Sequence, residues 1–220
     1  MQYGIRAVYP GKHPNGNFRL TKQAGEFIKP FLEATRLFTE ITISDKPPMG
    51  CFNLDAFRNL GLSLDGASNI MHWYYPIVPD HLPKRFYEPI FSKEVAKHDK
   101  IVVIRTARYL NSNVDVSKLR YCRDRLLFLG TSDEHLALQA KIGPIEYKPI
   151  SNLLEAAEIL LGARGVIGNP SGLYSLAEVL KVPRIFICPL RTNVQPIGGW
   201  FEIVERTKNF DQALDRLCEK

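Results

Sequence analysis

The 220-residue sequence lacks long apolar runs, and no hydrophobic stretch approaches the roughly 18 residues of a membrane span. Its first residues contain no apolar core of the kind that a signal peptide needs. Its four cysteines lie far apart and form no CxxC motif, which is typical of proteins from a reducing compartment. We therefore expect a cytoplasmic chain without a transmembrane segment.

Several ligand motifs are missing as well. The five histidines form no HxH, HExxH or HxxxH spacing, so we expect no dedicated metal site. The absence of GxGxxG and of a P-loop disfavours dinucleotide oxidoreductases and P-loop NTPases, and no GxSxG nucleophile turn is present. The net charge is +6, but the basic residues are spread along the chain, which favours an anionic ligand over a dedicated nucleic-acid site.

The second half of the chain alternates short apolar strands with helices, which predicts an α/β fold with a mostly parallel sheet. The expected strands are Ile101–Ile104, Leu126–Leu129, Ile145–Tyr147, Gly165–Gly168, Arg184–Cys188 and Phe201–Val204. The expected helices are Thr131–Ile142 with a capping box, one capped by Ser151, Leu173–Lys181 and Asn209–Cys218. Ligands of such sheets bind at the carboxyl ends of the strands, here Arg105-Thr106, Gly130-Thr131, Gly168-Asn169 and Pro189-Leu190.

The first half is less regular. We predict a strand at Ile5–Tyr9, a helix from Thr21 to about Glu40, a strand at Glu40–Ser44 and a short helix at Asn53–Leu60. The pattern changes near Asp99, which divides the chain into an expected domain of residues 1–99 and a second of residues 100–220.

The most informative stretch is Leu153–Leu190, which has the pattern of helix, strand, glycine turn, helix and strand. The turn Asn169-Pro170-Ser171-Gly172 precedes a helix, so free N–H groups of Ser171 and Gly172 could hold a phosphate. The alternative is that these residues only form a tight turn.

Two charged residues near strand or helix ends are further candidates. Arg105 can bind a phosphate through two N–H groups, and the alternative is a structural ion pair. Glu178 can accept hydrogen bonds from two ribose hydroxyls, and the alternative is a pair with Lys181. The segment 193–199 follows the strand Arg184–Cys188 and is suited to line a cleft, or is a plain connection.

Taken in order, the segments IVVIRTARYLNSNVDVSKL, LLFLGTSDEH, GVIGNPSGLYSLAEVLKVPRI and NVQPIGG resemble the C-terminal half of glycosyltransferase family 9, the heptosyltransferase-like enzymes. More narrowly, the chain is similar to short members of bacterial or phage origin. The resemblance covers residues 101–199, and more loosely residues 20–200.

The resemblance implies a GT-B fold, in which two Rossmann-like domains flank the active site. It implies a C-terminal domain that binds a nucleotide-sugar donor and transfers the sugar to a hydroxyl of an unknown glycan or other acceptor, with no cofactor or metal. The donor contacts that it implies are Arg105, Asn169, Ser171, Gly172 and Glu178, with Asn193 and Pro196 in a nearby loop.

The chain departs from the family in two ways. It has no Gly-Asp turn before the first helix, so the catalytic base is unassigned among Asp45, Asp55, Asp65 and Asp80. The family's turn carries Gln where this chain has Pro170. The alternative function is therefore a catalytically silent GT-B-like protein that binds a nucleotide or glycan or acts in assembly. The N-terminal domain also looks a strand and a helix short, and pairing with a second copy of the chain would complete its cleft.

Overall fold

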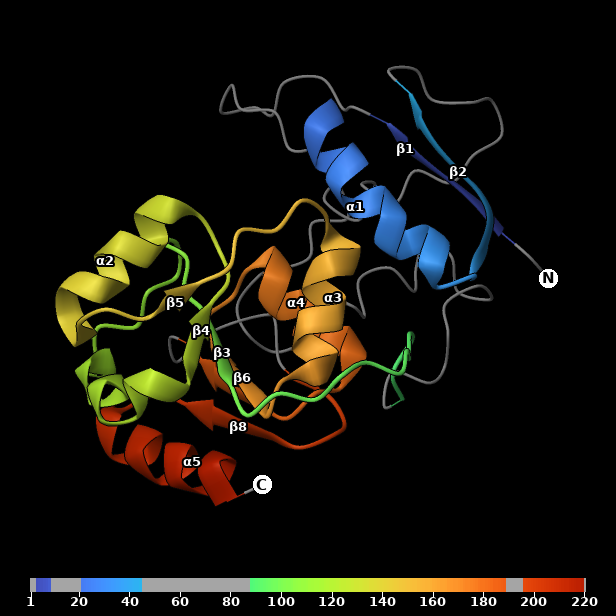
Figure 1. Cartoon of the computed structure of the whole chain (residues 1–220). Helices are drawn as coiled ribbons and strands as arrows, with labels where there is room; N and C mark the ends of the chain where they lie inside the picture. The colour runs from blue at the N-terminus through green and yellow to red at the C-terminus, as the bar shows by residue number, and fades with distance from the viewer. Residues whose placement is uncertain (1–2, 9–20, 45–87, 189–195, 220) are drawn as a thin grey trace, which may run out of the picture. The chain divides into compact units, whose positions relative to one another are not determined.

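The computed structural model describes residues 3–8, 21–44, 88–188 and 196–219 (Figure 1). The chain divides into two compact units, one formed by Met1–Asn53 with Ile150–Ala157 and the other by Leu54–Pro149 with Glu158–Lys220. The boundary expected near Asp99 stays a prediction. The helix expected at Asn53–Leu60 lies outside the described residues.

The first unit contains a parallel βαβ arrangement of β1 (Tyr3–Val8), α1 (Lys22–Ala34) and β2 (Phe38–Ser44). Helix α1 begins after Thr21, whose hydroxyl accepts a hydrogen bond from the Ala24 N–H at 3.1 Å. The side chain therefore satisfies one of the helix's unpaired donors.

The expected extension of this helix to Glu40 was wrong. The helix ends at Ala34, and Arg36 adopts a left-handed backbone conformation with φ of 56°. Residues from Phe38 onward instead pair with β1 in a parallel ladder. The alternating, β-branched sequence of this stretch fits a strand better than another helical turn.

The second unit is built on a six-stranded sheet in the order β5-β4-β3-β6-β7-β8, and every adjacent pair is parallel. The strands are β3 (Ile101–Ile104), β4 (Leu126–Phe128), β5 (Glu146–Tyr147), β6 (Gly165–Gly168), β7 (Arg184–Ile187) and β8 (Phe201–Val204). Counted within this sheet, the order is 3-2-1-4-5-6, which is that of a doubly wound Rossmann-like fold. The predicted α/β class with a mostly parallel sheet is confirmed.

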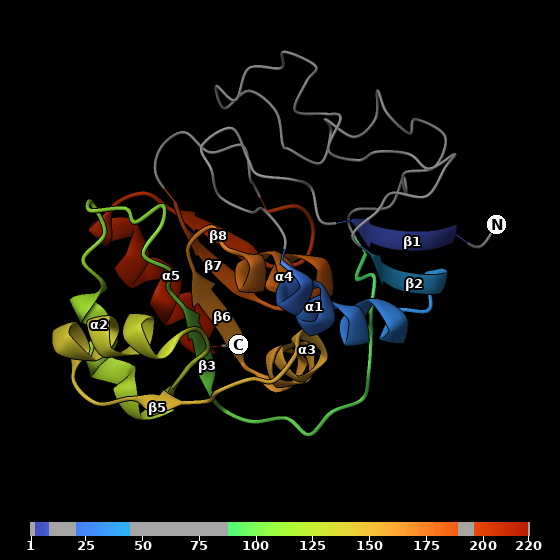
Figure 2. The same cartoon turned by 90° about the horizontal axis from the view of Figure 1, so that it is seen from above.

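Helices cover both faces of this sheet. They are the 3₁₀ segment η3 (Val116–Arg125), α2 (Ser132–Ile142), α4 (Gly172–Leu180) and α5 (Thr207–Glu219), together with the last residues of α3 (Leu153–Gly162), whose part up to Ala157 belongs to the first unit. One face packs with η3, α2 and α5 in a core that includes Phe128, Ile185 and Phe210. On the other face Tyr174 of α4 stacks on Phe186, with ring centroids 4.6 Å apart. Figure 2 shows α5 and α4 on opposite sides of β6 and β7.

The expected helix starts were confirmed at one site and wrong at another. Thr131 and Glu134 form the predicted capping box of α2. Ser151 does not cap α3, because the Oδ1 atom of Asn152 accepts the Glu155 N–H at 3.0 Å. Ser151 instead donates its hydroxyl to the Glu155 carboxylate. The 3₁₀ segment η3 was not predicted, since its polar sequence has no clear periodicity.

An extended segment leads into β3 and closes the C-terminal end of α3. The backbone N–H of His98 donates to the Gly162 carbonyl at 2.9 Å, and its ring Nε2 lies 3.0 Å from the Ile159 carbonyl. The Lys97 ammonium donates to the Leu161 carbonyl at 2.7 Å. Cationic and N–H groups therefore satisfy carbonyls that the helix leaves unpaired.

Within the described ranges, none of the helices combines the length and the apolar character that crossing a membrane would require.

Candidate functional site

The site lies where the strand order of the second unit reverses, between β3 and β6. From β3 the chain moves through β4 to β5 in one direction and then returns to β6 on the other side. Ligands of doubly wound sheets bind in the crevice outside the carboxyl ends of the two strands at this point. Ile104 and Gly168 are paired at the ends of these strands. Because β3 pairs in parallel with β4 and β6, Arg105, Gly130 and Asn169 follow these strands at the same end of the sheet. The expected strand end Pro189-Leu190 lies outside the described residues.

A small hollow lies at this edge. Its volume is about 10 Å³, which is the space of roughly one water molecule. It is lined by residues of β3, η3, β6 and β7 and by the two residues that follow β3 and β6: Val103, Ile104, Arg105, Val116, Leu119, Ile167, Gly168, Asn169 and Ile187. A larger ligand would therefore lie over the hollow rather than within it.

The side chain of Asn169, which follows β6, is hydrogen-bonded to the loop that follows β3. Its side chain is buried, and its Oδ1 accepts the backbone N–H of Thr106 at 2.9 Å. Its Nδ2 donates to the carbonyls of Thr106 at 3.1 Å and of Arg108 at 2.6 Å. The amide that was expected to contact a donor thus already holds the loop that follows β3.

Arg105, the first residue of that loop, is half-buried. Burial lowers the pKa of its guanidinium, although such a group stays charged at neutral pH. Among the described residues we find no hydrogen bond or ion pair for it. Partial burial of a cation has a free-energy cost, and a bound anion would offset it.

The N-terminus of α4 lies after β6, on the other side of the same edge. Ser171 is its N-cap, and the hydroxyl accepts the Tyr174 N–H at 3.1 Å. Gly172 is exposed, and among the described residues a Cβ added there would meet no atom within 4 Å beyond its chain neighbours and its own helix. Space is therefore open at a helix end whose first N–H groups and dipole favour anions.

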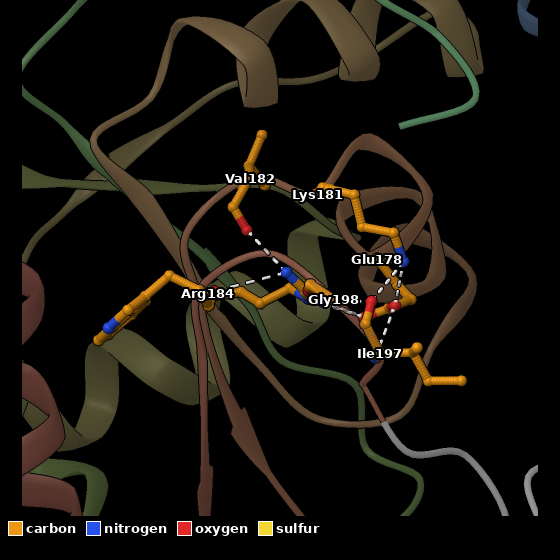
Figure 3. A network of polar contacts seen from close by, with 7 residues as sticks. Glu178, Lys181, Val182, Arg184, Ile197 and Gly198 are labelled. Atoms are coloured by element: carbon orange, nitrogen blue, oxygen red, sulfur yellow. Dashed lines mark hydrogen bonds and ion pairs between the residues drawn. The ribbon is translucent and has the colours of Figure 1, made fainter. Parts of the chain in front are cut away.

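Glu178 lies in a different environment from the one expected of a ribose contact (Figure 3). Its Oε1 accepts the Lys181 ammonium at 2.7 Å and the Ile197 N–H at 2.9 Å. Its Oε2 accepts Nε of Arg184 at 2.7 Å. The alternative pair with Lys181 is thus present, and the carboxylate is only 12% exposed.

Arg184 is the residue that sequence reasoning missed. It begins β7, is fully buried, and donates to the carbonyls of Val182 at 3.1 Å and Gly198 at 2.8 Å (Figure 3). The only sign of it in the sequence is an arginine inside an apolar strand. Its network with Glu178 fixes the chain around Gly198, where the expected cleft-lining segment ends. Asn193 of that segment lies outside the described residues.

No group of three or more His, Cys, Asp and Glu side chains gathers as a metal site in the described part of the chain.

The fold and the site together define a doubly wound α/β unit with a cationic, N–H-lined edge at the switch of strand order. Compared with models of protein families, with curated proteins and with solved structures, the chain matches none of them.

Proposed function

We propose that the chain is a glycosyltransferase that holds the diphosphate of a nucleotide-sugar donor at the β3/β6 edge. The observation that carries this proposal is the half-buried Arg105, which has no partner among the described residues and follows β3 at the point where α4 begins after β6. A guanidinium and a helix N-terminus are both suited to a phosphate. The family resemblance supplies the donor class, the GT-B arrangement and the metal-independent transfer.

In this reaction an acceptor hydroxyl loses its proton to a general base and attacks the anomeric carbon. The bond from that carbon to the diphosphate breaks, and a nucleoside diphosphate leaves with an additional negative charge. Arg105 and the first N–H groups of α4 would stabilise that charge. The candidate bases Asp45, Asp55, Asp65 and Asp80 lie outside the described residues, so the base stays unassigned.

A second candidate is a catalytically silent protein that binds a nucleotide or glycan or acts in assembly. It is favoured by the use of Asn169 and Glu178 in internal contacts, which removes two of the expected donor contacts. The two candidates share the anion site and differ in turnover.

The test is calorimetric titration of the intact chain with ADP-, UDP-, GDP- and CDP-sugars, followed by an assay for release of the nucleoside diphosphate. Arg105→Gln should weaken binding roughly 10- to 100-fold, because it removes a charged hydrogen bond to phosphate. Arg123→Gln is the matched control, since Arg123 is exposed and lies near the opposite end of the strands. Binding of no nucleotide sugar would contradict the proposal, and binding without turnover of any acceptor would favour the second candidate.

A further inference from the structure

Tyr109 adopts a left-handed backbone conformation in the turn of the loop that follows β3. Its φ is 56°, in the left-handed region that is unfavourable for a bulky side chain. In the described ranges Arg36 and Lys181 are the other non-glycine residues with positive φ. Those two follow the ends of α1 and α4, where such a residue commonly ends a helix. Tyr109 instead lies in a turn of the loop after β3, where a bulky residue with positive φ is uncommon.

Hydrogen bonds from the Asn169 side chain hold the backbone of the loop around Tyr109 in the absence of a ligand. Asn169 reaches across from β6 and donates to the Arg108 carbonyl at 2.6 Å, and its Nδ2 lies 3.5 Å from the Tyr109 carbonyl. Asn169 also lines the hollow at the switch point. The backbone at Tyr109 is therefore held at the edge of the proposed anion site, so its conformation needs little further ordering on binding.

The side chain of Tyr109 is 61% exposed, and the next residue, Leu110, is 47% exposed. Within the part of the chain that the structure describes, the tyrosine has no ring contact and no side-chain hydrogen bond. Exposure alone does not indicate a binding role for a tyrosine, because Tyr121 on η3 is 82% exposed as well. Tyr109 differs because it lies four residues after Arg105, in the same pinned loop.

We propose that Tyr109 is a stacking platform for the ring of a phosphate-bearing ligand, either the base of a nucleoside phosphate or the sugar of a sugar phosphate. This inference rests on the proposed function, because Arg105 and the N-terminus of α4 hold the phosphate. An exposed aromatic ring in the same loop as a cation can bind a ring while the cation binds a phosphate of the same ligand. Stacking tolerates different bases, so Tyr109 contributes affinity for a ring rather than selection among bases.

Calorimetry on the full chain tests this with four probes: ADP, UDP, glucose 1-phosphate and pyrophosphate, which has no ring. Tyr109→Ala should weaken ADP and UDP roughly 5- to 100-fold if a base stacks, or glucose 1-phosphate if the sugar stacks. Pyrophosphate should bind as before. Tyr109→Phe should keep the affinity, since it keeps the ring, and Tyr121→Ala is the exposed-tyrosine control.

Two outcomes separate this inference from the function on which it rests. If the unchanged chain binds none of the four probes, the anion site itself is refuted. If the unchanged chain binds them and Tyr109→Ala binds them equally well, or loses pyrophosphate to the same extent, the stacking role alone is refuted. Tyr109→Gly gives a further check, because glycine relieves the strained φ. It should lose ring-dependent binding without losing resistance to urea.

Discussion

Arg184 and Glu178 are joined at a single carboxylate oxygen: Nε and Nη2 of Arg184 lie 2.7 and 2.6 Å from Oε2 of Glu178. The arginine side chain is fully buried and the glutamate is 12% exposed. Charges removed from water in this way depend on each other, because either one left alone would be buried without compensation. The pair therefore belongs to the folded framework that carries the site.

Glu178→Gln should destabilise the protein by about 3–5 kcal/mol, since Arg184 and Lys181 would keep their charges without the carboxylate. Urea unfolding measures this free energy. Glu202→Gln is the control, because its pair with Arg216 is more exposed and should contribute less than about 1 kcal/mol. Loss of nucleotide-sugar affinity at unchanged stability would instead support a direct contact of Glu178 with ribose.

Asn169→Ala should cost about 1–3 kcal/mol of stability, because the Thr106 N–H and the Arg108 carbonyl lose their partner. Hydrogen exchange at the Thr106 amide should become faster, and phosphate-ligand affinity should fall with it. Asn113→Ala is the matched control and should change neither, because Asn113 is exposed and uses its backbone N–H and carbonyl for the hydrogen bonds that it makes to Asn111 and Thr207. Unchanged exchange at Thr106 in Asn169→Ala would show that the loop holds its shape without this side chain.

Gly168→Ala should destabilise by about 1–3 kcal/mol, because its Cβ would lie 2.8 Å from Cδ2 of Tyr174 and 2.9 Å from the Ile104 carbonyl. Gly172→Ala should be neutral or stabilise by up to about 1 kcal/mol, since alanine favours helix and, in the described part of the chain, no atom outside its own helix and its neighbours lies within 4 Å of the new methyl. Thermal unfolding of the two variants compares them directly. Equal losses would mean that the helix start is more crowded than the structure shows.

Stability should fall in alkaline solution because of two thiols, the buried Cys188 and the half-buried Cys122. Burial raises the pKa of Cys122 and of Cys188 to about 11 from an ordinary value of 9.0. The unfolded chain therefore releases these protons at a lower pH than the folded chain, and the stabilisation present below pH 9 is lost as the pH rises through 11. A variant that carries both Cys122→Ala and Cys188→Ala should show a shallower decline in the free energy of unfolding above about pH 9. An identical slope in both proteins would assign the decline to other groups.

The sequence predicted much of the second unit because its central strands β3, β4 and β6 are short, apolar and buried on both faces. Ile101–Ile104, Gly165–Gly168 and Phe201–Val204 have the expected bounds. Continuous apolar runs between helices have few other ways to bury themselves. The strand that begins at Arg184 was also predicted, although its first residue is charged.

The roles of the polar residues could not be predicted in the same way. Asn169 binds groups about 60 residues away, and Arg184 binds carbonyls near Gly198, so their partners are set by the strand order. A single sequence gives the side chain and its element, but not which distant backbone groups lie opposite it. The donor contacts expected of Ser171 and Gly172 remain predictions, and the structure places both at an open helix end.

The carbonyls at the end of α3 are held by Lys97 and His98, which precede β3 in the chain. These two residues therefore belong to the folded structure of the second unit, although they precede β3, the first strand of its sheet. A fragment that starts at Asp99 would leave the Leu161 and Gly162 carbonyls without these donors. A fragment meant to contain the six-stranded sheet alone should therefore include Lys97 and His98.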